Sequence, residues 1–398
     1  MSFQETTSVS WFGRIKRSVG GVVVGLLLIV GMVVLLFWNE GRAVTTARSL
    51  SEGAGLVVSV EAGSVDPARE GALVHVSGPV TTTDRPADPE FGVAADGLRL
   101  IRKAEMYQWI ETRRSETRTK VGGGEETITT YTYAEGWSDR AQDSSQFRQP
   151  DGRTNPPMDI QGRSFQVADA TLGAFSLSQR IIGMIGGQQP LAVTNDQLQD
   201  IQDAIGAGIR ARIADGRIYI GANPQEPRVG DYRIGYEAVP AGPASIVGRQ
   251  AGSGFEPYQT QAGNALLMVQ SGLVPADQMF SDAMSSNTVL TWIVRIVGLM
   301  FLIFGFSLIM APLGVIGDVI PFVGSIVRMG TGIVAAVLGI VVGTVTIAIA
   351  WFWYRPLTAL IILAIGAAAA YAVTKLGRKK QAAADAPPAA EPPPAAAA

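Results

Sequence analysis

The segment Asp143–Ser145 places a carboxylate beside two hydroxyls and could hold a serine nucleophile. A serine becomes nucleophilic only when a neighbouring base takes its proton. The sequence has no cysteine and a single histidine, His75, which lies in a valine-rich strand pattern. Lys103 or Lys120 would have to act as the base, and nothing in their spacing supports that role. We therefore predict no catalytic residue, no metal site and no cofactor, and interpret Asp143–Ser145 as a turn.

A second group of polar residues lies within or beside long apolar segments, where charges are costly and are usually paired. Asn39, Glu40 and Arg42 follow the first such segment, and Arg295 lies six residues inside the second. Glu40 and Arg42 could dock against another helix or lipid head groups. Alternatively, they could be polar residues of the kind that ordinarily lie at a membrane surface, with no specific partner. Arg295 could extend to the membrane surface, or could serve a pore or a helix pair.

Five further residues complete the predicted interface and packing set. Asp318 and Arg328 flank a broken apolar stretch and could pair across it, or could be exposed at the interface. Gly339 and Gly343 have the spacing of small residues that permits close helix contact, and we favour packing inside the bundle over dimerisation. Arg355 stands in the short connection before the last apolar segment.

Four apolar segments position these residues. Only 17% of the 398 residues are charged, against about 25% in ordinary soluble domains. Residues 19–38 contain no charge and are long enough to cross a hydrocarbon core of about 30 Å. Residues 289–310, 333–354 and 357–373 follow near the C-terminus. We predict four transmembrane helices, one N-terminal and three C-terminal.

Basic residues set the predicted orientation, because they concentrate in cytoplasmic segments. Basic clusters near both ends place residues 1–18 and 374–398 in the cytoplasm, the latter as a basic and then Ala/Pro-rich tail. Residues 39–288 then form a domain on the far side. The Ala- and Gly-rich composition suggests the periplasm and inner membrane of a bacterium. Residues 311–332 are expected as a cytoplasmic apolar loop, with a re-entrant course left open.

The large domain is predicted as β-rich and mostly antiparallel, so the fold class is α+β. Residues 98–120 and 126–137 form a long hairpin that turns at three glycines. Its arginines and lysines, with Tyr107 and Trp109 between them, could suggest nucleic-acid binding. The interleaved glutamates and the periplasmic placement argue against that, and we expect a solvated hairpin or one that faces a second copy.

Residues 131–157, YTYAEGWSDRAQDSSQFRQPDGRTNPP, carry the most distinctive pattern. A Tyr-x-Tyr strand is followed by a tryptophan, an Asp-Ser-Ser-x-Phe stretch and a Gly-x-x-Asn-Pro turn. Together with Asn-Glu-Gly-Arg-Ala at 39–43, Val-Gly-Asp-Tyr-Arg at 229–233 and Arg-Pro-Leu at 355–357, this pattern resembles the transmembrane protein 43 (TMEM43, LUMA) family. The family's turn usually carries a histidine where this sequence has Arg153, which argues against a metal or acid–base role there.

The resemblance implies a non-enzymatic membrane organiser with four spans that self-associates. We therefore expect a scaffold that contacts membrane lipids, forms a homo-oligomer and binds other envelope proteins. An oligomeric channel or transporter component is the alternative, and it would need a polar path through the bilayer. The candidate contact residues between domains are Tyr107, Trp109, Tyr131, Tyr133, Trp137, Phe147 and Asn155.

Overall fold

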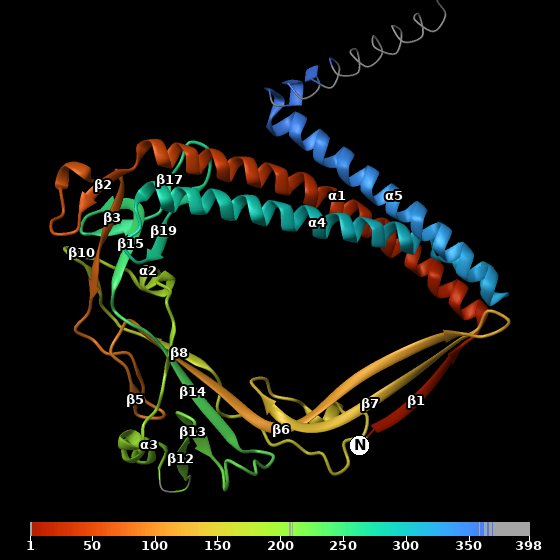
Figure 1. The fold of residues 1–398 in the computed structure, drawn as a ribbon, viewed down its shortest axis with the longest axis horizontal. Coiled ribbons are helices and arrows are strands. Elements are labelled where there is room, and N and C mark those ends of the chain that lie inside the picture. The colour runs from red at the N-terminus through yellow and green to blue at the C-terminus, as the bar shows by residue number, and fades with distance from the viewer. Residues whose placement is uncertain are drawn as a thin grey trace, which may run out of the picture.

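The computed structural model describes residues 2–206, 208, 210–357, 359–361, 364, 365 and 368. Three long helices lie along one side of the molecule, and β-sheets with two short helices form the rest (Figure 1). The sheets are almost entirely antiparallel. The predicted α+β class is therefore confirmed.

The long helices are apolar and long enough to cross a membrane. They are α1 (Trp11–Leu56), α4 (Ala276–Gly317) and α5 (Pro321–Tyr354), and the short helices are α2 (Gln179–Met184) and α3 (Leu198–Ile205). The Ser10 hydroxyl begins α1 by accepting a hydrogen bond from the Gly13 amide at 3.2 Å. Proline fits the first turn of α5 because the amide it lacks would have no helical partner there.

The structure differs from the predicted loop over 311–332, because both helices extend into it. α4 continues past Pro312 to Gly317, and α5 begins at Pro321, so three residues connect them. A Cβ on Gly317 would lie 3.3 Å from the Cα of Gly324. Small residues therefore let α4 and α5 pack closely on the two sides of a short turn. The prolines and glycines of this segment had predicted an irregular loop instead.

Three candidate spans are present in the described part of the chain. They include the predicted segments 19–38, 289–310 and 333–354. The predicted fourth span, 357–373, is described at only a few residues, and the predicted tail, 374–398, lies outside the described residues.

Glycines set the distances between the long helices. A Cβ on Gly25 of α1 would lie 2.7 Å from the carbonyl oxygen of Gly305 in α4. Gly339 and Gly343 of α5 lie against Ile303 and Leu299 of α4, with Cβ positions 2.6 Å and 2.2 Å from the nearest side-chain atoms. The predicted small-residue spacing therefore packs within the bundle.

The larger sheet contains a long hairpin that extends from the rest of the protein. Its strand order is β1 (Ser2–Val9), β7 (Glu125–Ser138), β6 (Arg99–Thr119), β14 (Tyr232–Val239), β13 (Arg217–Ile220) and β12 (Ala211–Ala214), with β8 (Arg163–Gln166) on β6 and β11 (Gln189–Leu191) on β14. β6 and β7 pair from Met106↔Ser138 to Thr119↔Glu125. We call β1, β7 and residues 106–119 of β6 the ribbon.

The second sheet lies near the ends of α1 and α4. Its order is β10 (Phe175–Ser176), β9 (Thr171–Leu172), β3 (Leu73–Thr81), β15 (Pro243–Ala251) and β16 (Gly254–Glu256), with β19 (Met268–Ser271) on β15 and β2 (Val58–Glu61) parallel to β3. Two small sheets pair β4 (Ala87–Asp88) with β5 (Val93–Ala94) and β17 (Tyr258–Gln259) with β18 (Ala265–Leu266).

Three apolar cores hold these parts together. One lies between the second sheet and α2 around Phe175, and another joins the larger sheet to α3 around Ile201. The third contains Leu50, Leu266 and Phe280, where α1 and α4 meet the sheets. The sheet-bearing part is therefore fixed to one end of the long helices.

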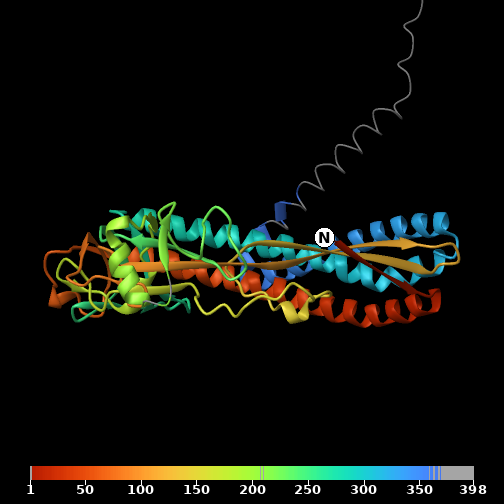
Figure 2. The same ribbon diagram turned by 90° about the horizontal axis from the view of Figure 1, so that it is seen from below.

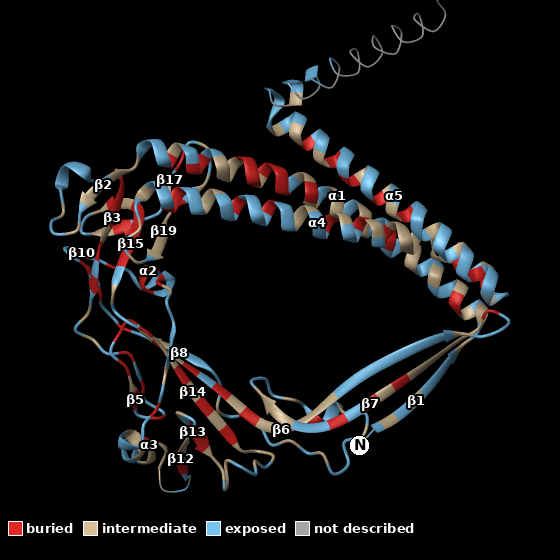
Figure 3. Cartoon of the chain, viewed as in Figure 1, coloured by how far each residue is buried: buried red, intermediate tan, exposed pale blue. Residues whose placement is uncertain are grey.

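The ribbon returns to the opposite end of the long helices, so the chain closes into a ring (Figure 1). Figure 2 shows the ribbon tip at the same end of the molecule as the start of α1 and the turn between α4 and α5. β1, which the sequence did not predict, pairs with residues 125–132 over eight positions. Figure 3 shows that the distal ribbon is mostly exposed. These contacts join residues 2–9 to a hairpin that the sequence analysis places on the other side of a membrane.

Candidate functional site: two polar clusters that join the helices

A buried ion pair connects the long helices in the half of the bundle that is nearer the sheets. Arg295 of α4 donates to the two carboxylate oxygens of Glu40 in α1 at 2.6 and 2.7 Å. The Glu40 side chain is 2% exposed and that of Arg295 is 13% exposed. Trp351 of α5 donates from Nε1 to Glu40 Oε2 at 2.9 Å. The Glu40 carboxylate therefore holds all three helices.

Aromatic rings complete the surroundings of Arg295. The guanidinium carbon lies 4.8 Å from the ring centre of Trp292 and 5.7 Å from that of Trp351. A charge at such a position is tolerated only with a close partner of opposite sign and polarisable neighbours. The bidentate geometry and the two indoles provide both.

Arg42 extends this network towards the sheets. Its guanidinium donates to Asn287 Oδ1 at 3.0 Å, to Thr291 Oγ1 at 3.1 Å and to Asn39 Oδ1 at 3.2 Å. Asn39, Glu40, Arg42 and Arg295 thus lie in one cluster that docks α1 on another helix. We call these four residues, with Asn287, Thr291 and Trp351, the domain-end cluster.

Sequence reasoning missed Asn287, Thr291 and Trp351 of that cluster. Asn287 and Thr291 precede the predicted Arg295 at intervals of four residues and therefore share one face of α4 with it. That spacing was the available signal. Arg355 lies beside this region, where it lines a cavity of about 450 Å³ with Val44 and Arg48.

A second cluster lies at the opposite end of the helices. Asp318 is fully buried and accepts from Arg14 at 2.7 Å and from Arg328 at 2.5 Å. Arg14 is 8% exposed, and it also donates to the carbonyl of Gly123 at 2.6 Å and pairs with Glu125 at 3.4 Å. We call these five residues the far-end cluster. It fastens the ribbon tip to α1 and to the turn between α4 and α5.

The pair of Asp318 and Arg328 follows the pairing alternative of the sequence analysis. Arg14 was missed, because its partners come from segments more than a hundred positions away. Gly324 makes room for the carboxylate, since a Cβ there would lie 1.9 Å from Asp318 Oδ1.

The predicted domain contacts pack largely against one another. Tyr107 lies 5.2 Å from Trp137, and Tyr133 lies 6.1 Å from Phe147, between ring centres. Tyr131 and Tyr133 are 8% and 3% exposed. The aromatic residues therefore hold the chain after β7 against the ribbon.

Asn155 fixes the same segment through its side-chain amide. Its Oδ1 accepts from the Trp109 amide at 2.7 Å, and its Nδ2 donates to the Trp109 carbonyl at 2.9 Å and to the Gln142 carbonyl at 3.1 Å. The Asn155 side chain thus bonds the backbone N–H and C=O of Trp109 in the way that a neighbouring strand would.

Replacing Asn155 with alanine should release this segment from the ribbon. The backbone groups of Trp109 and Gln142 lose their partners, at a cost of about 1–3 kcal/mol. Hydrogen exchange at the Trp109 amide should accelerate at least tenfold. Asp151→Ala, in the exposed turn nearby, is the control, and equal exchange in both variants would contradict this role.

The sheets contain a third buried ionic group. Arg102 donates to Asp88 Oδ2 at 2.9 Å and to Glu90 Oε2 at 2.6 Å, and the Tyr236 hydroxyl donates to Asp88 Oδ2 at 2.8 Å. Asp88 is fully buried and Arg102 is 4% exposed. Burial and the charge of Asp88 raise the pKa of Tyr236, so it stays a protonated donor.

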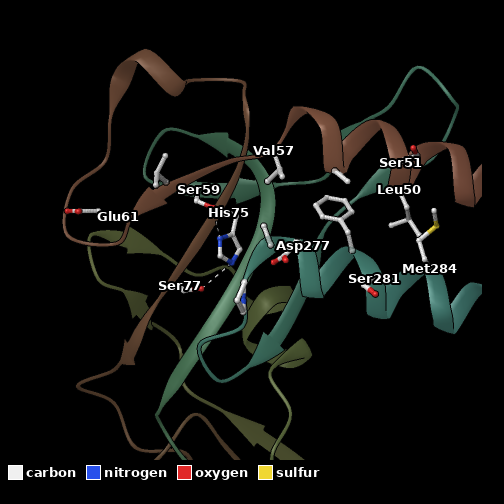
Figure 4. Close-up of a pocket in the computed structure, with 15 residues that line it drawn as sticks. Leu50, Ser51, Val57, Ser59, Glu61, His75, Ser77, Asp277, Ser281 and Met284 are labelled. Atoms are coloured by element: carbon white, nitrogen blue, oxygen red, sulfur yellow. Dashed lines mark hydrogen bonds between the residues drawn. The ribbon is translucent and has the colours of Figure 1, made fainter.

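His75 lies in a cavity of about 910 Å³ between the ends of α1 and α4 and the second sheet (Figure 4). Its Nε2 lies 2.9 Å from the carbonyl of Val274, and its Nδ1 lies 3.1 Å from the Ser59 hydroxyl. Because a carbonyl only accepts, Nε2 carries the proton and Nδ1 accepts from Ser59. Within the described residues, the ring also lies within 3.1 Å of the Ser77 hydroxyl at Nε2, so its partners are two serine hydroxyls and a backbone carbonyl.

The buried polar side chains described above connect elements of the protein to one another. Within the described residues, no three or more His, Asp or Glu side chains are arranged to hold a metal ion. The buried ionic groups bind one another across helices and strands. They can therefore fix the relative positions of elements that lie far apart in the sequence.

Comparison with known proteins places the chain among membrane proteins. The family model for transmembrane protein 43 matches residues 106–356. Transmembrane protein 43 of Homo sapiens and that of Mus musculus are each 32% identical over 362 residues, covering 88% of this chain and 88% of the relative. The homolog of Drosophila melanogaster is 27% identical over 357 residues, covering 86% and 91%. No solved structure matches.

Proposed function

Since the chain belongs to the transmembrane protein 43 family, we propose that this integral membrane protein is a non-enzymatic scaffold that self-associates. The observation that supports the proposal is that the buried charged side chains form ion pairs between different elements of the protein. Glu40, Asp318 and Asp88 each bind an arginine of another element. This pattern supports a rigid frame that holds its sheets at a membrane.

The outer edge of β1 offers a surface for self-association. β1 is the first strand of the larger sheet, and among the described residues no strand pairs with its free side. Exposed edges can pair with a second chain through main-chain hydrogen bonds. Copies confined to one membrane meet at high effective concentration, so weak edge contacts add up.

Two lysines on this edge should disrupt association. Thr6 and Ser8 are exposed and point to one face of β1. In Thr6→Lys/Ser8→Lys, like charges would oppose each other when two edges approach. The mass of the extracted protein, measured by light scattering after subtraction of detergent, should fall at least twofold. Gln225→Lys, in an exposed loop of the sheets, is the control, and an unchanged mass in the double variant would exclude edge pairing.

The channel alternative gains less support from the described residues, because the Arg295 charge is paired with Glu40. The bacterial inner membrane and the binding of lipids and envelope proteins remain part of the proposal. The sidedness derived from basic residues, with 1–18 and 39–288 on opposite faces, stays a prediction.

A further inference from the structure

The cavity of about 450 Å³ beside the domain-end cluster lies between one face of α1 and the residues that follow α5. Figure 1 shows α5 ending beside α1, well short of the sheets. Two arginines line the cavity together with an apolar wall. The arginines are Arg48 and Arg355, and the wall is Val44, Ala47, Pro356 and Leu357. Among the described residues that line this cavity there is no carboxylate.

Exposed tryptophans mark the membrane surface at this end of the helices. Trp38 of α1, Trp292 of α4 and Trp353 of α5 each expose more than half of their surface. Every helix that is long and apolar enough to cross a membrane therefore has an exposed tryptophan here, and tryptophan concentrates where hydrocarbon meets the head groups. Arg355 follows Trp353 by two residues. The cavity thus lies at the depth of the phospholipid phosphates.

Close contacts between α1 and α5 hold the two arginines at this cavity. The Tyr354 ring packs directly on α1, since a Cβ on Gly41 would lie 2.6 Å from its Cζ atom. Its ring centre is 5.3 Å from that of Phe37. The Arg48 guanidinium donates from Nη2 to the Tyr354 carbonyl at 3.0 Å. That bond uses one of five N–H donors and holds Arg48 beside the residue that precedes Arg355.

The two carboxylates of α1 are engaged by other partners. Glu40 pairs with Arg295. Glu52 accepts from the backbone amides of Gln261 and Ala262 at 2.9 and 3.1 Å. The described lining of the cavity therefore keeps a positive charge. Because a guanidinium forms bidentate hydrogen bonds to phosphate oxygens, the matching ligand is a phosphate.

We propose that this cavity binds the phosphate of an anionic phospholipid from the adjoining leaflet. Arg48 and Arg355 hold the phosphate oxygens, and the apolar wall contacts the glycerol backbone and the first methylene groups of the lipid. A soluble anion would match the arginines but would gain nothing from that wall. The inference rests on the lipid binding that is part of the proposed function, for which it names the site. It does not depend on self-association.

Native mass spectrometry, which counts the lipids bound to each chain, tests the site. Delipidated protein in detergent is titrated with phosphatidylglycerol or with phosphatidylcholine. We expect the wild type to bind phosphatidylglycerol more tightly. Arg48→Gln/Arg355→Gln should lower that affinity about tenfold or more, because charge-assisted hydrogen bonds are lost. Glutamine still offers a donor to the Tyr354 carbonyl.

Two further variants serve as controls. Arg180→Gln/Arg212→Gln removes two exposed arginines of α2 and β12. It makes the same change in net charge and should bind as the wild type does. Arg48→Lys/Arg355→Lys keeps both positive charges and should retain most of the affinity. Circular dichroism checks that each variant keeps its fold.

Three results would overturn the proposal. Equal affinity of the wild type and Arg48→Gln/Arg355→Gln for phosphatidylglycerol would show that these arginines do not form the site. Equal affinity of the wild type for both lipids would show that the charge of the head group is not recognised. Displacement of the lipid by excess inorganic phosphate would assign the cavity to a soluble anion. None of these results bears on the mass of the oligomer, so self-association is tested separately.

Discussion

Arg295→Leu is expected to lower the free energy of unfolding by about 3–5 kcal/mol, because it leaves the Glu40 carboxylate buried without its ionic partner. Glu40 is 2% exposed and would keep only the Trp351 indole as a donor. The loss should separate α1 from α4 and α5 at the domain-end cluster. Thermal unfolding in detergent, followed by tryptophan fluorescence, measures it.

A double variant shows whether the cost comes from the stranded charge. Glu40→Leu/Arg295→Leu removes both charges and should recover most of the stability, because two apolar side chains suit the surrounding helices. Arg17→Leu, an exposed arginine of α1, is the matched control and should change little. Equal losses of stability in the single and double variants would show that the ion pair does not stabilise the contact between α1 and α4.

Arg102→Met should have a similarly large effect in the sheets. It leaves Asp88 fully buried with the Tyr236 hydroxyl as its remaining side-chain partner, which again costs about 3–5 kcal/mol. The expected result is early loss of the packing around Phe91, which lies 5.0 Å from the Arg102 guanidinium. Denaturant unfolding monitored by near-ultraviolet circular dichroism tests this.

The controls for Arg102 separate its charge from its bulk. Arg114→Met changes an exposed arginine of the same strand and should leave stability nearly unchanged. Asp88→Ala/Arg102→Met removes both charges and should be less destabilised than Arg102→Met alone. If Arg102→Met and Arg114→Met unfolded at the same denaturant concentration, the buried group would have no structural role.

The sequence predicted the elements whose signals are local. Three apolar segments gave three long helices, because hydropathy and length are properties of a continuous stretch. The glycines at 122–124 gave the hairpin turn, where Gly122 and Gly123 adopt φ of 89° and 79°. The pairing of Asp318 with Arg328 was also within reach, since ten residues separate them.

What the sequence did not predict depends on contacts between distant segments. β1 is polar, and its strand forms against β7, more than a hundred positions away. The helical course of 311–317 overrides Pro312, because α5 and the far-end cluster pack against this turn. The partners of Glu40 and Arg14 lie 255 and 304 positions away, so no local pattern could join them.

The mass of the gently extracted protein tests the scaffold most directly. The chain has a mass of 42.0 kDa, and light scattering with detergent subtracted gives the number of chains per particle. The proposed scaffold predicts one discrete oligomer, a whole multiple of that mass, which persists on dilution to micromolar concentration. A monomer throughout that range would contradict self-association.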